Sequence, residues 1–262
     1  MENKSLSGTL SYTSITLLIL AVLMFPIPGR FMDFVLLFNI VLSVLLLIDV
    51  RQRKTNNDYS IFSKYLYYMS IFGLAINMMV TRQIVTMGET FNSTILRSIA
   101  SLLTEIRIEI LIIVLILFLA CTVYVFIKRL LKACNTISAA AGLNLDNRHK
   151  KITNIQTEYD IRSITEEEAD KKKMIIQDEV NFFNALNNSA GFFCNCEKFR
   201  LALILVNSAG GIIFGTRFKG EPFSDAFEFY VSLTVSAGIL ALIPVFLIVI
   251  SLEIVLLQKL KN

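Results

Sequence analysis

The chain has 262 residues and a formal net charge of +4, and 55% of its residues are hydrophobic while 18% are charged. Soluble domains average about 45–50% apolar and 25% charged residues, so this composition argues against a soluble domain, a disordered chain and a nucleic-acid-binding surface. One histidine, His149, and four cysteines without CxxC spacing argue against a metal site. We expect no metal, no cofactor and no nucleic-acid partner. The sequence shows no nucleophile–base pair and no phosphate-binding loop, so we do not expect an enzyme.

Four apolar runs in the first half of the chain predict transmembrane helices at 11–28, 31–50, 65–86 and 108–127. Roughly 20 helical residues cross a 30 Å hydrocarbon core, which matches the length of these runs. The third run is the most polar because it carries Asn77 and Arg82, so we expect this helix to face protein rather than lipid. The Arg82 side chain either extends to the membrane surface or pairs with another group. We expect Asn77 and Arg82 to hydrogen-bond or pair with residues of other helices.

The segment 128–198 is polar and predicts a helical loop. Thr165 and Glu168 have the spacing of a capping box, which starts a helix predicted over 166–186. Glu167 with Lys171 and Glu168 with Lys172 are expected to form i,i+4 ion pairs on a solvated helix face.

Two further spans follow, at 199–217 and 230–257. Gly211 and Gly215 give the first of them a face of small residues, which favours close helix packing over the alternative of a ligand-lined break in the helix. Pro244 removes one backbone donor from the last span and is expected to kink it.

The positions of Lys and Arg predict the orientation of these six spans. The basic residues gather in four segments, 1–10, 51–64, 128–198 and 258–262, while the opposite segments hold only Arg30, Arg97, Arg107 and Lys219. Basic loops stay in the cytoplasm, so both termini are expected there. We predict an all-α membrane protein in three parts: a four-span bundle (1–127), a cytoplasmic helical loop between spans four and five (128–198) and a two-span hairpin (199–262).

Four motifs, in the same order and at matching spacing, resemble the FHIPEP family, the FlhA-type export gates of flagellar and virulence type III secretion systems. The residues that carry the resemblance are Phe25-Pro26-Ile27-Pro28 with Asp33 and Asn39; Asp58–Phe62 with Leu74–Val85; Ile164–Ala169 with Glu179–Leu186; and Tyr230 with Leu233, Gly238 and Pro244. One motif alone would be weak, but together they cover most of residues 20–250.

The resemblance implies a membrane component of a bacterial type III protein-export apparatus in the cytoplasmic (inner) membrane. Its implied partners are the lipid bilayer, other export-apparatus membrane proteins and further copies of itself in a ring, a nonamer in the family. It also implies polar or proton-path roles for a set of residues in and near the spans: Asp33, Asn39, Asn77, Arg82, Asp146 and Glu158.

Several positions depart from the family pattern. Gly73 stands where the family motif has arginine, Ala237 where it has aspartate, and Cys194-Asn195-Cys196 where it has Arg-Gly-Asp. The family also continues into two more spans and a cytoplasmic docking domain, which we expect this chain to lack. The departures predict a scaffold without an autonomous proton relay. Two alternatives remain: a non-transporting assembly or regulatory subunit, and an unrelated six-span small-molecule transporter.

Overall fold

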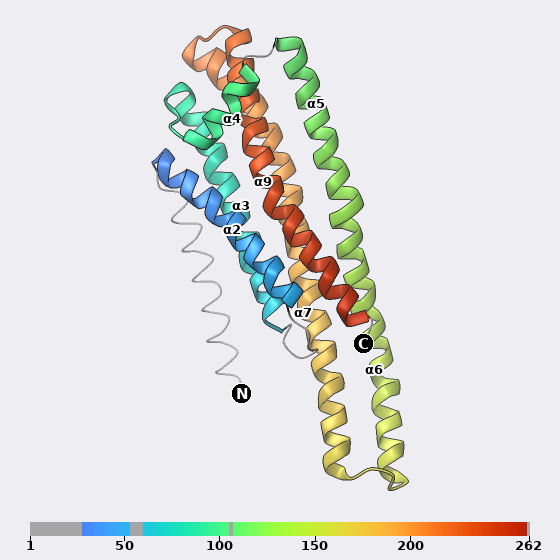
Figure 1. The fold of residues 1–262 in the computed structure, drawn as a ribbon. Helices are drawn as coiled ribbons and strands as arrows, with labels where there is room; N and C mark the ends of the chain where they lie inside the picture. The colour runs from blue at the N-terminus through green and yellow to red at the C-terminus, as the bar shows by residue number, and fades with distance from the viewer. Residues whose placement is uncertain (1–27, 53–59, 105–106, 261–262) are drawn as a thin grey trace.

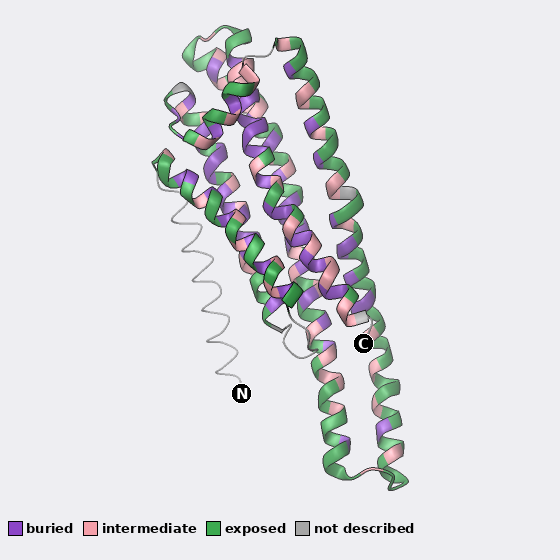
Figure 2. Cartoon of the chain, in the orientation of Figure 1, coloured by how far each residue is buried: buried purple, intermediate pink, exposed green. Residues whose placement is uncertain are grey.

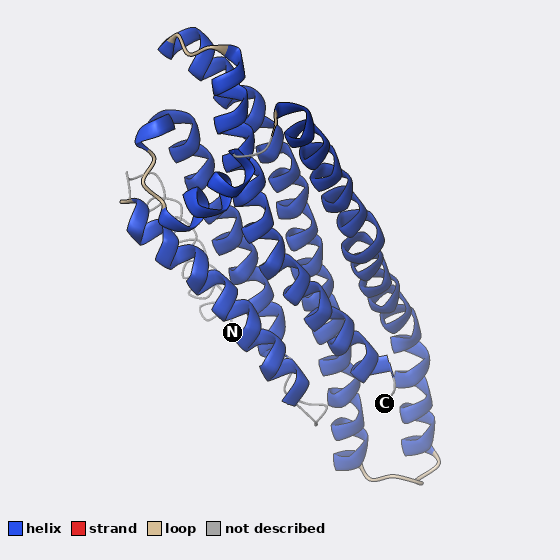
Figure 3. Cartoon of the chain, turned by 45° about the horizontal axis from the view of Figure 1, so that its top comes forward, coloured by secondary structure: helices blue, strands red, loops and turns tan. Residues whose placement is uncertain are grey.

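The computed structural model describes residues 28–52, 60–104 and 107–260 of the chain, and this part contains helices and no strand (Figures 1 and 3). Five of its continuous helices are long and apolar enough to cross a membrane. The predicted all-α class with several long apolar helices is therefore confirmed. The first predicted span, 11–28, lies outside the described residues except for its last residue.

The helices follow one another with short connections. In chain order they are α2 (Gly29–Gln52), α3 (Ser60–Met87), the 3-10 turn η1 (Gly88–Thr90), α4 (Thr94–Thr104), α5 (Ile108–Val125), α6 (Lys132–Asp160), α7 (Glu166–Leu205), α8 (Gly211–Phe214) and α9 (Phe223–Leu260). Three π-helical segments interrupt the α-helical hydrogen bonding without breaking the helices: η2 (Phe126–Leu131), η3 (Val206–Gly210) and η4 (Gly215–Lys219).

Helices α2, α3 and α9 and the upper part of α7 form a bundle, with α4 and α5 packed against α9 (Figure 1). Figure 2 shows the buried residues concentrated in this bundle, while the lower ends of α6 and α7 are mostly exposed. Apolar side chains also point outward from the bundle, such as Phe34 on α2 and Ile116 on α5, which are 61% and 59% exposed. Outward apolar faces of this kind are what lipid contact requires.

Two helices run without interruption from the bundle into the polar segment. One continues from α5 through η2 into α6, over Ile108–Asp160, and the other continues from α7 to the end of η4, over Glu166–Lys219. The predicted boundaries near residues 127 and 198 therefore lie inside continuous helices. The helix predicted to end at 186 extends to Leu205 because no proline interrupts it and its one glycine before that point, Gly191, has helical neighbours on both sides.

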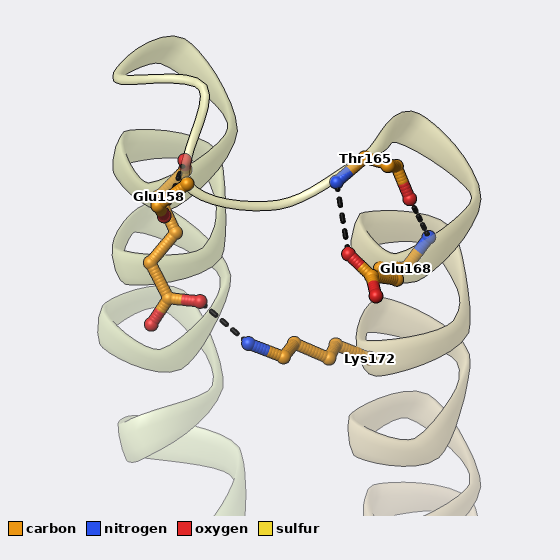
Figure 4. A network of polar contacts seen from close by, with 5 residues as sticks. Glu158, Thr165, Glu168 and Lys172 are labelled. Atoms are coloured by element: carbon orange, nitrogen blue, oxygen red, sulfur yellow. Dashed lines mark hydrogen bonds and ion pairs between the residues drawn. The ribbon is translucent and has the colours of Figure 1, made fainter.

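The lower ends of α6 and α7 form an antiparallel hairpin, whose closed end is drawn in Figure 4. The predicted capping box is confirmed, because the Thr165 hydroxyl accepts from the Glu168 amide and the Glu168 carboxylate accepts from the Thr165 amide. The predicted direct contact of Glu168 with Lys172 is not present among the described residues, since Lys172 Nζ donates to Glu158 Oε2 of α6 at 2.6 Å. The two hydrogen bonds with Thr165 and the nearby charge of Lys172 still lower the pKa of Glu168, so the expected attraction acts at longer range.

Candidate functional site

A buried ion pair lies in the middle of the bundle. Glu197 and Arg200 are one helical turn apart on α7 and are 5% and 8% exposed, with Nη2 of Arg200 3.0 Å from Oε1 of Glu197. Arg200 Nη1 also donates to the carbonyl of Ala241 on α9 at 3.1 Å. Ala241 lies halfway along α9, so the pair is deep within the bundle and not at its end.

The helices facing α7 make room for this pair. Gly73, halfway along α3, has no side chain, and a Cβ there would lie 3.1 Å from Nη2 of Arg200. On α9, Pro244 lacks the amide hydrogen that would bond to Leu240 in an uninterrupted helix, and the next carbonyl, that of Ala241, accepts the bond from Arg200. The missing side chain at Gly73 and the carbonyl of Ala241 thus accommodate the guanidinium from two sides.

The pair lines a cavity of about 40 Å³ between α3, α5, α7 and α9. Its polar lining consists of side chains from all four helices and from η3: Asn77, Thr81, Thr122, Glu197, Arg200, Asn207 and Thr234. Two of the π-helical segments border it, since Phe126 and Leu130 belong to η2 and Asn207 to η3. Single π-helical turns occur often at functional sites in helical proteins.

Several polar atoms in this lining have no hydrogen-bond partner among the described residues. They are Oδ1 of Asn207, Oε1 of Glu197 and Nε of Arg200. The contact between Glu197 and Arg200 is close, but it does not have the direction of a hydrogen bond, so the carboxylate oxygen keeps its accepting capacity. Leaving a buried polar atom unpaired costs about 1–3 kcal/mol, more for a charged group.

The polar candidates from the sequence are not gathered at this cavity. Asn77 lines it, but its amide donates to Gly73 O of its own helix at 2.7 Å, so the expected bond across helices is wrong for Asn77 within the described residues. Arg82 is exposed on α3. Asp146 and Glu158 lie on the hairpin, where Asp146 is exposed and Glu158 pairs with Lys172.

The two candidates on α2 are buried at the other side of the bundle. Asp33 accepts hydrogen bonds from the Ser93 hydroxyl and, at 2.8 Å, from the Thr94 amide, which is the first amide of α4. It therefore caps α4 from a distant part of the chain, as an N-cap residue does locally. Asn39 is 6% exposed, and its Oδ1 has no partner among the described residues.

The packing candidates lie where α7 and its extension meet α9. A Cβ on Gly211 would lie 2.4 Å from Cδ1 of Tyr230, and one on Gly215 would lie 2.8 Å from Cε2 of the same ring and 2.5 Å from Oε2 of Glu221. Tyr230 is fully buried. The small-residue face thus receives an aromatic ring of this same chain.

Sequence reasoning missed Glu197 and Arg200 as site residues. It placed the start of the fifth span at residue 199, which left Glu197 outside and Arg200 at the edge. The available signal was their i,i+3 spacing, which puts both charges on one helix face, together with the absence of a side chain at Gly73.

Comparison with known proteins places the chain in a family. Residues 19–261 match the model of the FHIPEP family. Flagellar biosynthesis protein FlhA of Borreliella burgdorferi is 31% identical over 238 residues, which are 90% of this chain and 34% of that protein. FlhA of Treponema pallidum is 31% identical over 223 residues (84% and 31%), and FlhA of Bacillus subtilis is 25% identical over 248 residues (95% and 35%).

The chain therefore spans about a third of the length of the curated relatives it matches. No solved structure matches it. The family match extends over the whole described bundle and hairpin, so the chain belongs to the FHIPEP family.

Proposed function

We propose that this chain is a membrane component of a bacterial type III protein-export apparatus, flagellar or virulence-associated. The observation that carries the proposal is the FHIPEP match over residues 19–261, which includes the buried ion pair, the packing glycines and the hairpin. The relatives that support a flagellar setting are named as flagellar biosynthesis proteins. The proposal assigns the chain no enzymatic activity and no nucleic-acid partner.

The proposed placement is multi-pass in the inner membrane, with six spans and both termini in the cytoplasm. The alternation of basic and sparsely charged segments supports it. The hairpin formed by α6 and α7 would then stand in the cytoplasm, where its exposed charged side chains are hydrated. Its proposed partners are lipid, other export-apparatus membrane proteins and further copies of the chain in a ring.

The structure bears on how such a component would work. Of the six polar residues expected from the resemblance, Asn77 alone lines the cavity, so we assign a place on a polar path to Asn77 and structural roles to Asp33 and Glu158. The departures at Gly73 and Ala237 remove two charged residues from the family pattern. The Glu197–Arg200 pair nevertheless supplies buried charge within the bundle.

The test is purification of the tagged chain from its native membrane, followed by size determination and identification of bound proteins. A large discrete complex that contains export-apparatus proteins is expected, and a monomer or dimer without them would overturn the proposal. Deletion of the gene then distinguishes a role in export from a role in assembly of the apparatus. Loss of secretion while the remaining apparatus still assembles indicates a transport role, whereas loss of assembly indicates the alternative of an assembly subunit.

A further inference from the structure

We propose that the cavity beside Glu197 and Arg200 is a binding site for ordered water inside the bundle. The bound water completes the hydrogen bonds of an ion pair whose cation, supplied from α7, fills the space over Gly73 of α3. The inference concerns the bundle alone and stands apart from the proposed export role.

The polar lining offers both acceptors and donors that have no hydrogen-bond partner among the described residues. The hydroxyls of Thr81, Thr122 and Thr234 donate to carbonyls of their own helices at 2.7, 2.8 and 2.7 Å, so toward the cavity these oxygens offer only lone pairs. Oδ1 of Asn207 and Oε1 of Glu197 add two more acceptors without a hydrogen-bond partner among the described residues, and Nε of Arg200 adds a donor. A ligand that completes these bonds must therefore both donate and accept.

Water fits both this chemistry and the space. Each water molecule brings two donors, and it can also accept, for example from Nε of Arg200, which has no hydrogen-bond partner among the described residues. A buried water needs about 10–15 Å³ and two to four polar partners, so a cavity of about 40 Å³ holds about three.

Other small ligands fit less well. A metal ion would meet the guanidinium of Arg200 beside the one carboxylate, and the described residues hold no group of three or more His, Cys, Asp or Glu side chains that could bind one. An anion would meet Glu197, which lies 3.0 Å from that guanidinium. An apolar ligand would leave the unpaired atoms as they are. A neutral molecule that both donates and accepts is the class that the lining selects.

The position of the cation also follows from the geometry. Arg200 reaches from α7 to within 3.1 Å of the place where residue 73 would carry a Cβ, so an arginine at 73 and an arginine at 200 would claim the same space. We infer that positions 73 and 200 are coupled, because the space over residue 73 holds one long cationic side chain and Arg200 of α7 already fills it.

The water site is tested on the unmodified protein by X-ray radiolytic labelling, in which hydroxyl radicals arise from water next to the labelled side chain. Leu130 and Ile204 line the cavity and are 1% and 8% exposed, while Leu66 and Ile248, at 0% and 3%, do not line it. Each leucine and isoleucine thus has a matched control. Labelling of Leu130 and Ile204 well above their controls is expected, and equal labelling would overturn the water site.

The coupling of positions 73 and 200 is tested by exchanging the two residues. Gly73→Arg and Arg200→Gly are each expected to reduce the yield of monodisperse detergent-extracted protein several-fold, because one crowds two cations and the other leaves Glu197 unpaired. The double variant should recover most of the yield. Gly191→Arg, at an exposed glycine of α7 with open space around it, is the control for adding an arginine. A double variant no better than the worse single variant would overturn the coupling.

Discussion

Gly210 and Gly211 allow a sharp test of how α7 and α9 pack. Both have helical backbone angles that alanine adopts freely, with φ and ψ of −65° and −42° at Gly210 and of −61° and −48° at Gly211. A Cβ on Gly211 would lie 2.4 Å from Cδ1 and 2.9 Å from Cβ of Tyr230. A Cβ on Gly210 would meet only Val206 Cγ1, at 3.9 Å. The two alanine variants therefore differ in packing and in little else.

The expected difference follows from two opposing terms. Alanine in place of glycine inside a helix stabilises by about 0.8–1 kcal/mol, and this gain applies equally to both variants. Overpacking costs about 1–3 kcal/mol and applies to Gly211→Ala alone. Rotating the Tyr230 ring does not relieve the contact, because the Tyr230 Cβ is attached to the backbone and also lies too close. Gly211→Ala should be less stable than Gly210→Ala by about 1–3 kcal/mol.

Thermal unfolding of detergent-extracted protein measures this difference. The chain has no tryptophan, so far-UV circular dichroism is the appropriate signal. At about 2–4 °C per kcal/mol for a chain of this size, the Tm of Gly211→Ala should lie about 2–12 °C below that of Gly210→Ala. Equal Tm values for the two variants would refute the close approach of Gly211 to Tyr230, and with it the assigned packing of α8 on α9.

Three more variants test other parts of the fold. Gly238→Ala would place a Cβ 2.2 Å from Cζ of Phe118 and should destabilise by about 1–3 kcal/mol; adding Phe118→Leu should reverse much of the loss of Tm. Asp33→Asn replaces one of the two accepting oxygens by a donating NH2 group and should therefore weaken the capping of α4 by about 1–3 kcal/mol, seen as faster hydrogen exchange in α4. The Thr165 amide, by donating to Glu168, holds the pKa of that carboxyl below its usual range. The stabilisation it brings is therefore present above the usual pKa and lost as the pH falls through the lowered one. Exchange protection of the first turn of α7 should fall in acid, and in Glu168→Gln it should not depend on pH.

The parts of the fold that depend on local sequence were predictable. Apolar runs long enough to cross a membrane predicted α2, α5 and α9, because helix length and hydropathy are properties of the run itself. The start of α7 was predictable for the same reason, since Thr165 and Glu168 complete their capping box within one turn.

The parts that depend on distant contacts were not. Helix α4 was not predicted, although Ser93 caps it locally by accepting from the Leu96 amide, because the carboxylate that holds this cap in place belongs to Asp33, about 60 residues earlier in the chain. The ion pair of Glu197 and Arg200 was not recognised as buried, because its burial depends on Gly73 of α3 and on the Ala241 carbonyl of α9, which belong to distant parts of the chain. Nothing in the local sequence around Phe126 or Val206 distinguishes a π-helical turn from an α-helical one.

Helix α7 has a mechanical consequence because it is one rigid rod from the hairpin to the cavity. Lys172, which ties the tip of the hairpin to α6, and Arg200, which lines the cavity, are separated by about 42 Å of unbroken helix at 1.5 Å per residue. A lateral force on the tip of the hairpin therefore tilts the segment of α7 that carries the ion pair inside the bundle. The first interruption of α-helical hydrogen bonding beyond this segment is η3, which begins just after Leu205 and contains Asn207 on the wall of the same cavity.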